Sequence, residues 1–245
     1  NSAKCWGYNS DGRVGDGTSL QRTSPVVVNC SAIIQGMSAG GDMTCAITVS
    51  GGVLCWGRNQ VNQLGDGSTT NRYSPVSVVG IVAPAVTVSC GGSHSCVILN
   101  TGGVQCWGLN DFGQLGDGTQ TTRLQATVVT GLAAKVTQLA LSHQTSCALL
   151  ETGNVQCWGS NSQGVLGLGD SKIDRKITPT TIVIDSNLKA KRLVAGQNHF
   201  CAISQNDSVY CWGNNDFGQL GQNDTVPRYQ PVLVSTLSGT VQQLE

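Results

Sequence analysis

The chain has 245 residues, of which 32 are glycine, and its 14 basic and 14 acidic side chains give a formal net charge of zero. This balance argues against a nucleic-acid-binding surface, which needs clustered positive charge. No apolar run reaches membrane-spanning length and no signal peptide is visible, so we expect a mature piece of an exported protein.

The tripeptide Cys-Trp-Gly occurs five times, which makes the chain a repeat array. The copies begin at Cys5, Cys55, Cys106, Cys157 and Cys211, spaced 50, 51, 51 and 54 residues apart. Each is followed roughly by x-Asn-x-x-Gly-x-Leu-Gly, a polar turn, Arg, Pro-Val and a short β-branched run. Apolar runs are short, bounded by Gly, Pro, Asn or Asp, and none keeps a helical period, which predicts an all-β protein. A tandem unit of about 51 residues with three or four strands is typical of a β-propeller blade.

The first copy lacks a partner that the other four have. Cys5 should pair with a cysteine ten residues upstream, and that position precedes Asn1. The last unit has 35 residues from Cys211 to Glu245, about 16 short of the period of 51. We therefore expect residues 1–245 to be a single propeller array cut from a longer chain, whose parent propeller has seven blades. The alternative is that a neighbouring subunit supplies the missing strand.

Three acidic residues recur next, each in the tripeptide Gly-Asp-Gly. They are Asp16, Asp66 and Asp117, and an arginine follows each of them, at Arg22, Arg72 and Arg123. Carboxylates are hard ligands, so calcium binding is one interpretation. The favoured one is a turn, because Asp-Gly is a common turn pair and the arginine can form a charge-assisted bond.

Cysteine pairs separated by ten residues flank turn residues in four repeats and predict disulfide-linked β-hairpins. The pairs are Cys45–Cys55, Cys96–Cys106, Cys147–Cys157 and Cys201–Cys211. Directly opposed residues of an antiparallel pair are close enough for a disulfide. Strand alternation places Ile47 and Val53 on the same face as the first pair, and Ala46 and Leu54 on the other, so both faces are apolar. The alternative is a set of reduced, buried cysteines.

Cys30 and Cys90 occupy no repeated position. We consider them candidates for an extra bridge between neighbouring blades, while Cys5 stays unpaired within the chain. Metal binding is disfavoured because no Cys-x-x-Cys or Cys/His cluster with tetrahedral spacing occurs. We expect no cofactor.

Disulfides are rare in the cytosol and persist in oxidising compartments, so the four predicted pairs indicate an extracellular or cell-surface protein. Three sequons, at Asn29, Asn206 and Asn223, are glycosylation candidates in a eukaryotic host, and Asn206 falls at a predicted hairpin tip.

Residues 168–193 depart from the repeat and are rich in basic side chains. This insertion holds six of the chain's 14 basic residues: Lys172, Arg175, Lys176, Lys189, Lys191 and Arg192. Inserted segments in arrays commonly emerge on one face, so it is a candidate partner loop. The slightly favoured alternative is a solvated variable loop, in which Asp170, Asp174 and Asp185 offset part of the positive charge.

Catalysis has little support in the sequence. His94 and His199 each lie two residues before a hairpin cysteine, and His143 lies four before one. A repeated position of this kind indicates that the histidine forms a structural hydrogen bond and does not act as a general base. We therefore expect that the protein is not an enzyme.

The array resembles the regulator of chromosome condensation repeat family through Cys-Trp-Gly-x-Asn-x-x-Gly-Gln-Leu-Gly-Asp-Gly, Arg-x-x-Pro-Val and Gly-Gly-Ser-His94-Ser-Cys96. Its paired cysteines are similar to those of the secreted or cell-surface type. The resemblance implies a non-enzymatic, extracellular propeller scaffold for protein–protein interaction, which includes the role of a building block in a surface or filamentous assembly. From the neutral charge and the short apolar runs, we expect neither a nucleic-acid partner nor membrane insertion. The alternatives are an intracellular guanine-nucleotide exchange factor of the same fold and a lectin-like carbohydrate-binding module.

Overall fold

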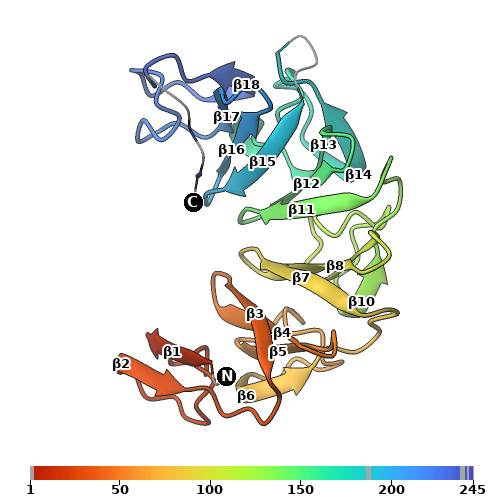
Figure 1. The fold of residues 1–245 in the computed structure, drawn as a ribbon, viewed down its shortest axis with the longest axis vertical. Helices are drawn as coiled ribbons and strands as arrows, with labels where there is room; N and C mark the ends of the chain where they lie inside the picture. The colour runs from red at the N-terminus through yellow and green to blue at the C-terminus, as the bar shows by residue number, and fades with distance from the viewer. Residues whose placement is uncertain (1–2, 186–188, 238–240, 242, 245) are drawn as a thin grey trace. The chain divides into compact units, whose positions relative to one another are not determined.

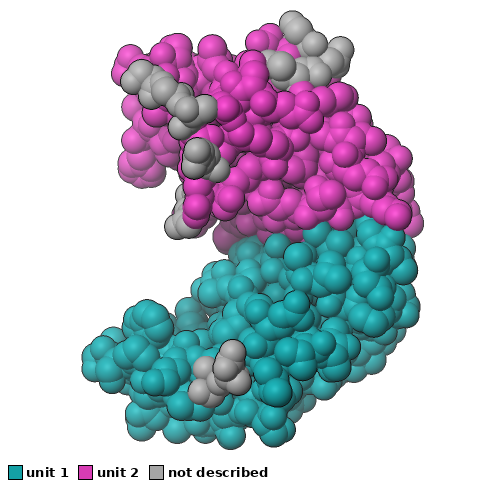
Figure 2. Space-filling model, viewed as in Figure 1, with its two compact units in different colours: residues 1–111, 121–128 teal, residues 112–120, 129–245 magenta. Residues whose placement is uncertain are grey.

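A computed structural model describes residues 3–185, 189–237, 241 and 243–244. The described residues form 18 strands and one short 3-10 helix, η1 (Ser162–Gly164), so the predicted all-β class is confirmed (Figure 1). The chain divides into two compact units, residues 1–111 with 121–128 and residues 112–120 with 129–245 (Figure 2).

The first unit contains one two-stranded sheet and two four-stranded sheets, all antiparallel. The orders are β1-β2, β3-β4-β5-β6 and β7-β8-β9-β10. The strands are β1 (Lys4–Gly7), β2 (Arg22–Val27), β3 (Ile34–Ala39), β4 (Met43–Thr48), β5 (Val53–Gly57), β6 (Arg72–Ser77), β7 (Ala85–Cys90), β8 (His94–Leu99), β9 (Val104–Gly108) and β10 (Arg123–Val128).

The second unit contains two four-stranded antiparallel sheets, β11-β12-β13-β14 and β15-β16-β17-β18. The strands are β11 (Val136–Leu141), β12 (Thr145–Leu150), β13 (Val155–Ser160), β14 (Arg175–Ile182), β15 (Ala190–Ala195), β16 (His199–Ser204), β17 (Val209–Gly213) and β18 (Arg228–Leu233). Each four-stranded sheet is one blade built from neighbouring strands of the sequence.

The register of the central hairpin follows the predicted alternation. Cys45 lies opposite Cys55, Ile47 opposite Val53, and Ala46 opposite Leu54. Apolar side chains therefore cover both faces of the blade, and each face needs a neighbouring sheet to remove it from water.

Within each unit, the core lies between consecutive sheets. In the first unit, Cys45, Ile47 and Leu64 share an apolar cluster with Val97 and Trp107 of the following blade. The second unit has a corresponding cluster that joins its two sheets and includes Cys157, Leu166 and Trp212. Burying such a side chain contributes about 1.5–3 kcal/mol. A single blade would leave these side chains in water, so packing between blades is what stabilises the sheets.

Candidate functional site

In four of the five repeats, the tryptophan of the Cys-Trp-Gly strand packs against a loop of the preceding repeat. We call this loop, which runs from the repeated Asn to the following Leu-Gly, the junction loop; the five copies are residues 9–15, 59–65, 110–116, 161–167 and 215–221. Four tryptophans are fully buried, and their indole N–H groups donate to main-chain carbonyls of the junction loop before them. The pairs are Trp56 to Arg13 (3.0 Å), Trp107 to Gln63 (3.0 Å), Trp158 to Gln114 (2.9 Å) and Trp212 to Val165 (3.1 Å).

A second set of polar contacts fixes the turn after each junction loop. In the second repeat, Asn59 Nδ2 donates to one oxygen of Asp66 at 2.9 Å, and Arg72 Nε donates to the other at 2.7 Å. Ser68 adds main-chain and hydroxyl donors. Burial raises the pKa of Asp66, but these hydrogen bonds outweigh it and the pKa lies below its usual value.

Asp16 has equivalent partners in the first repeat: Thr18 donates through its main chain and hydroxyl, and Arg22 Nε donates at 2.6 Å. Thr119 donates to Asp117 in the third repeat. The carboxylates thus act as acceptors within their own turns. Among the residues that the structure describes, no group of three or more His, Cys, Asp or Glu side chains is arranged to hold a metal ion.

Eight cysteines form four cross-strand disulfides at the positions that the ten-residue spacing predicts: Cys45–Cys55, Cys96–Cys106, Cys147–Cys157 and Cys201–Cys211. In every one the two Cα atoms are 4.1 Å apart. This separation is nearer to the roughly 4.5 Å of a non-hydrogen-bonded antiparallel pair than to the roughly 5.5 Å of a hydrogen-bonded one.

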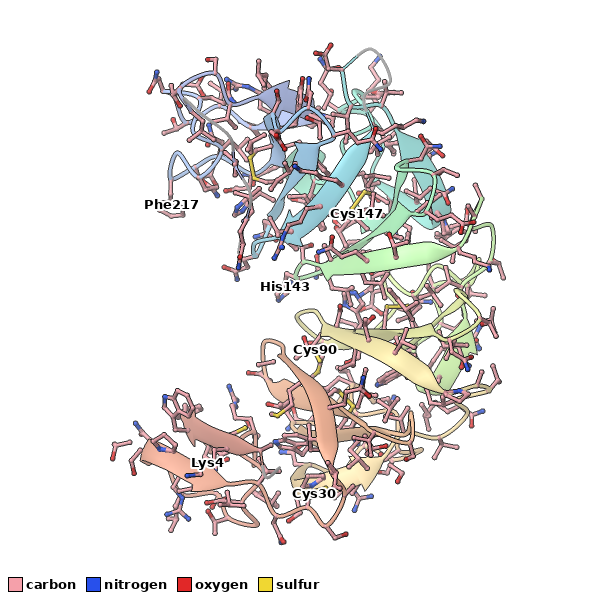
Figure 3. The ribbon with its side chains drawn as sticks, viewed as in Figure 1. Lys4, Cys30, Cys90, His143, Cys147 and Phe217 are labelled. Atoms are coloured by element: carbon pink, nitrogen blue, oxygen red, sulfur yellow. A yellow bond between two sulfur atoms is a disulfide. The ribbon has the colours of Figure 1, made fainter. Side chains whose placement is uncertain are left out.

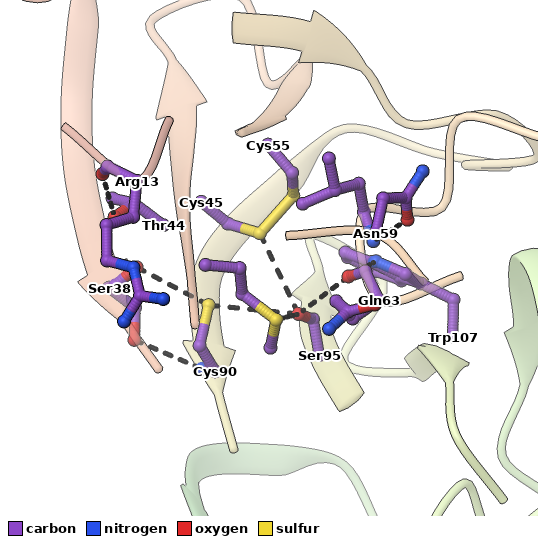
Figure 4. Close-up of a disulfide and its surroundings, with 12 residues drawn as sticks. Arg13, Ser38, Thr44, Cys45, Cys55, Asn59, Gln63, Cys90, Ser95 and Trp107 are labelled. Atoms are coloured by element: carbon purple, nitrogen blue, oxygen red, sulfur yellow. Dashed lines mark hydrogen bonds between the residues drawn. A yellow bond between two sulfur atoms is a disulfide. The ribbon is translucent and has the colours of Figure 1, made fainter. Parts of the chain in front are cut away.

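The suggested bridge between Cys30 and Cys90 is wrong, because both are free thiols (Figure 3). Cys30 follows β2 and packs near Val28, Ala46 and Trp56. Cys90 ends β7, where its main-chain N–H donates to Ser38 Oγ at 3.1 Å and its thiol donates to the Ser38 carbonyl at 3.4 Å (Figure 4). The two residues belong to different sheet junctions, which keeps their sulfur atoms apart.

Cys5 is also a free thiol, half-buried on β1, and burial raises its pKa. In the described chain, β1 pairs only with β2, whereas β5, β9, β13 and β17 each lie between two strands. A groove of about 470 Å³ borders β1 and the β3–β4 hairpin. It is lined by Cys5 and Trp6 from one side and by Met37 and Met43 from the other.

The basic insertion does not form one cluster in the structure. Arg175 and Lys176 begin β14, whereas Lys191 and Arg192 begin β15. Several have partners close in the fold: Arg175 pairs with Asp174, Lys191 with Asp207, and Lys189 donates to Asn154. Lys172 is exposed in the loop before β14. Part of the insertion, residues 186–188, lies outside the described residues.

The remaining candidates lie apart from one another. His94 is buried, His143 is exposed, and His199 is half-buried, with its pKa lowered by burial. Asn29, Asn206 and Asn223 are all exposed, and Asn206 lies in the β16–β17 turn. No helix in the described part of the chain is long and apolar enough to cross a membrane.

Sequence reasoning missed two features of the site. The methionines that line the groove carry no repeated signal, and Phe217, which is 92% exposed, stands where Val61 and Phe112 occur in other repeats. The place of Phe217 in the junction loop can be found by aligning the five loops, but its exposure cannot.

Comparison with known proteins shows the family of the chain. The family model described as the RCC1-like domain matches residues 2–245. The chain is 32% identical over 156 residues to the ultraviolet-B receptor UVR8 of Arabidopsis thaliana, covering 63% of this chain and 35% of that protein. It is 34% identical over 137 residues to the human X-linked retinitis pigmentosa GTPase regulator, covering 56% of this chain and 13% of that protein.

Among solved structures, yeast RCC1 (Prp20) bound to Kap60 has a TM-score of 0.83 at 22% identity, covering 99% of this chain and 59% of that one. This likeness shows the propeller fold. The chain spans about a third or less of the length of these curated relatives.

Proposed function

Because the chain belongs to the RCC1-like family of β-propellers, we propose that it is a non-enzymatic, extracellular scaffold that binds other proteins. One relative of the same fold was solved in complex with Kap60, and another structure is described by its binding to Gsp1p and histones. Rigid blades that expose loops and edges suit such a role.

The observation that carries the proposal is the open edge of β1 beside its groove. A strand edge offers main-chain donors and acceptors to an incoming extended segment, and apolar pockets next to it select side chains. In the other repeats, the strand at this place carries the cysteine that bonds the Cys-Trp-Gly strand, as Cys45 bonds Cys55. We therefore propose that β1 receives a strand with a cysteine opposite Cys5, supplied by the rest of the parent chain or by a neighbouring subunit.

A peptide with the β4 sequence Met-Thr-Cys-Ala-Ile-Thr, activated as a thiopyridyl disulfide, tests this proposal. The Cys5 thiol would attack the peptide sulfur, form the mixed disulfide and release thiopyridone. Peptide mapping should place the adduct at Cys5, severalfold faster than with a scrambled peptide that keeps its cysteine in the same position. Equal rates for the two peptides, or preferred modification of Cys30, would contradict the proposal.

The extracellular assignment rests on the four disulfides, because such bonds persist in oxidising compartments. Intact mass after alkylation, without reductant, should show at most three modified cysteines in residues 1–245 of the secreted native protein, and two where Cys5 is bonded to the supplied strand. Eleven alkylated cysteines would overturn this part of the proposal.

An intracellular exchange factor is the second candidate, since one relative is described as a GTPase regulator. Release of fluorescent nucleotide from a panel of small GTPases measures it directly. Our proposal predicts that the chain leaves the release rate unchanged. Among the described residues, no arrangement specifically favours the lectin-like alternative.

A further inference from the structure

The junction between the two four-stranded sheets of the first unit holds a free thiol beside a disulfide. One sheet is β3-β4-β5-β6 and the other is β7-β8-β9-β10. Cys90, at the end of β7, is free and packs against the apolar cluster that contains Cys45 and Cys55. The sulfur atoms of three cysteines therefore gather at one place, although they come from two blades.

Two serines fix the Cys90 sulfur next to one end of this disulfide. The thiol donates to the carbonyl of Ser38 at 3.4 Å, and Ser38 is the residue directly opposite Cys45 in the pairing of β3 with β4. Ser95 Oγ lies 3.8 Å from Cys90 Sγ and 3.7 Å from Cys45 Sγ. Figure 4 shows the Cys90 sulfur on the Cys45 side of the bond, with Cys55 beyond it. Cys45 Sγ is therefore the atom that faces the thiol.

The disulfide is enclosed by the two blades. Cys45, Cys55 and Ser95 are all 0% exposed, and the sulfur of Met43 lies 4.0 Å from Ser95 Oγ. A thiol from solution can reach this bond only if the blades open, whereas the Cys90 thiol is already in place. Holding two reacting groups together in this way raises their effective concentration far above that of any dissolved reagent.

The second unit has the same junction without the thiol. Ala195 ends β15 as Cys90 ends β7, and it packs against the cluster that contains the Cys147–Cys157 disulfide. Phe200 lies opposite Ala195, at the place where Ser95 lies opposite Cys90. Alanine and phenylalanine thus satisfy the packing of this junction. The thiol and the hydroxyl occur together, beside one disulfide, where the fold requires neither.

We propose that Cys90 exchanges with the hairpin disulfide and converts the Cys45–Cys55 bond into a Cys45–Cys90 bond between blades. The Cys90 thiolate attacks Cys45 Sγ, the Cys45–Cys55 bond breaks, and Cys55 leaves as a thiolate that takes up the proton given up by Cys90. One disulfide breaks as another forms, so the step needs no oxidant or reductant. This redox device is separate from partner binding and does not rest on it.

The exchange changes what the covalent bond holds together. The hairpin bond joins β4 to β5 within one sheet, whereas the new bond joins β4 to β7 of the next sheet. The product therefore ties consecutive blades to each other and leaves a free thiol on β5. The number of free cysteines stays the same, so total thiol titration does not distinguish the two forms, and the linked peptides must be mapped.

Single hairpin cysteines test whether the two sulfur atoms can bond. All proteins carry serine at positions 5 and 30. With oxidised glutathione, Cys55→Ser should form a Cys45–Cys90 disulfide, seen by peptide mapping without reductant. The matched control, Cys157→Ser, leaves Cys147 beside alanine and should give only a free thiol or a glutathione adduct there. A folded Cys55→Ser protein, judged by circular dichroism, that yields no Cys45–Cys90 peptide would overturn the proposal.

The native exchange is the second test, and it does not require Cys55→Ser to fold. The protein with serine at positions 5 and 30 is held without oxidant or reductant, acidified, and labelled in urea with N-ethylmaleimide. Burial raises the pKa of Cys90 to about 11, against bonds from Ser95, Ser38 and the Cys45 main chain. The thiolate is the attacking form, so labelling of Cys55 should appear about a hundredfold faster at pH 9 than at pH 7.

Cys90→Ala, which copies Ala195, is the control for the native exchange. It should leave Cys55 unlabelled at both pH values, because the hairpin bond then has no internal attacker. Equal labelling of Cys55 with and without Cys90 would overturn the proposal, and so would a native protein that gives no Cys45–Cys90 peptide at pH 9.

Discussion

Asp66 is a single side chain that holds together the turn after its junction loop. Its carboxylate is 5% exposed and accepts bonds from Asn59, Ser68 and Arg72. Since the pKa in the folded state lies below its usual value, the carboxylate stabilises the fold above the unfolded-state pKa of about 3.9. That contribution is lost as the pH falls through the lower, folded-state pKa.

We expect Asp66→Asn to lower the free energy of unfolding by about 1–3 kcal/mol at pH 7, because Arg72 loses its charged partner. The difference from the wild type should shrink below pH 4, as the wild-type carboxylate is protonated. Urea unfolding at several pH values measures both effects. Asp224→Asn is the matched control and should have a smaller effect, since Asp224 is 38% exposed. A deficit for Asp66→Asn that is the same at pH 2 and pH 7 would refute this explanation.

The three free thiols differ in environment. Burial raises the pKa of Cys90 to about 11, partly offset by bonds with Ser95 and Ser38. At pH 8 only roughly one Cys90 thiol in a thousand is then a thiolate, the form that reacts. Iodoacetamide should therefore modify Cys30 long before Cys90 in native protein, and both at similar rates in urea. Fast native labelling of Cys90 would show that its enclosure is transient.

At the scale of the strands and loops, substitutions at Gly65 and Gly67 distinguish the cost of backbone strain from the cost of disturbed packing. Both have a positive φ, 66° and 79°, so alanine is strained at either place by about 1–2 kcal/mol. A Cβ on Gly65 would also lie 2.6 Å from the indole of Trp107, whereas one on Gly67 meets nothing within 4 Å. We expect Gly65→Ala to destabilise the protein by about 1–3 kcal/mol more than Gly67→Ala in thermal or urea unfolding. Equal losses would mean that the junction loop can move away from the tryptophan.

The repeated elements could be predicted from the sequence because their signals are local. Strand alternation and a ten-residue spacing suffice to place Cys45 opposite Cys55, and three other repeats supply independent copies of the same pattern. Cys30 and Cys90 lack a repeated neighbour, so their contacts depend on packing between sheets that no local rule describes. The groove next to Cys5 depends likewise on Met37 and Met43, which reach it from another sheet.

The surface of the whole molecule has no net charge to attract a polyanion. With 14 basic and 14 acidic residues, and ion pairs such as Arg72–Asp66 and Arg22–Asp16, few counterions would be released from DNA on binding. We expect duplex DNA binding at 150 mM salt to be no tighter than about 10⁻⁴ M, the weak end of the nonspecific range, measured by fluorescence anisotropy. A micromolar affinity that weakens steeply with salt would reveal a basic surface that the charge total hides.

The junction loop also sets where this chain could be cut or recombined. Residues 112–120 belong to the second compact unit, although β9 before them and β10 after them belong to the first. A gene fragment that stops at the end of a sheet would therefore separate a tryptophan from the loop carbonyl that accepts its indole hydrogen bond. Duplication, deletion or grafting of a repeat should succeed when the exchanged segment is staggered, so that each Cys-Trp-Gly strand travels with the loop of the repeat before it.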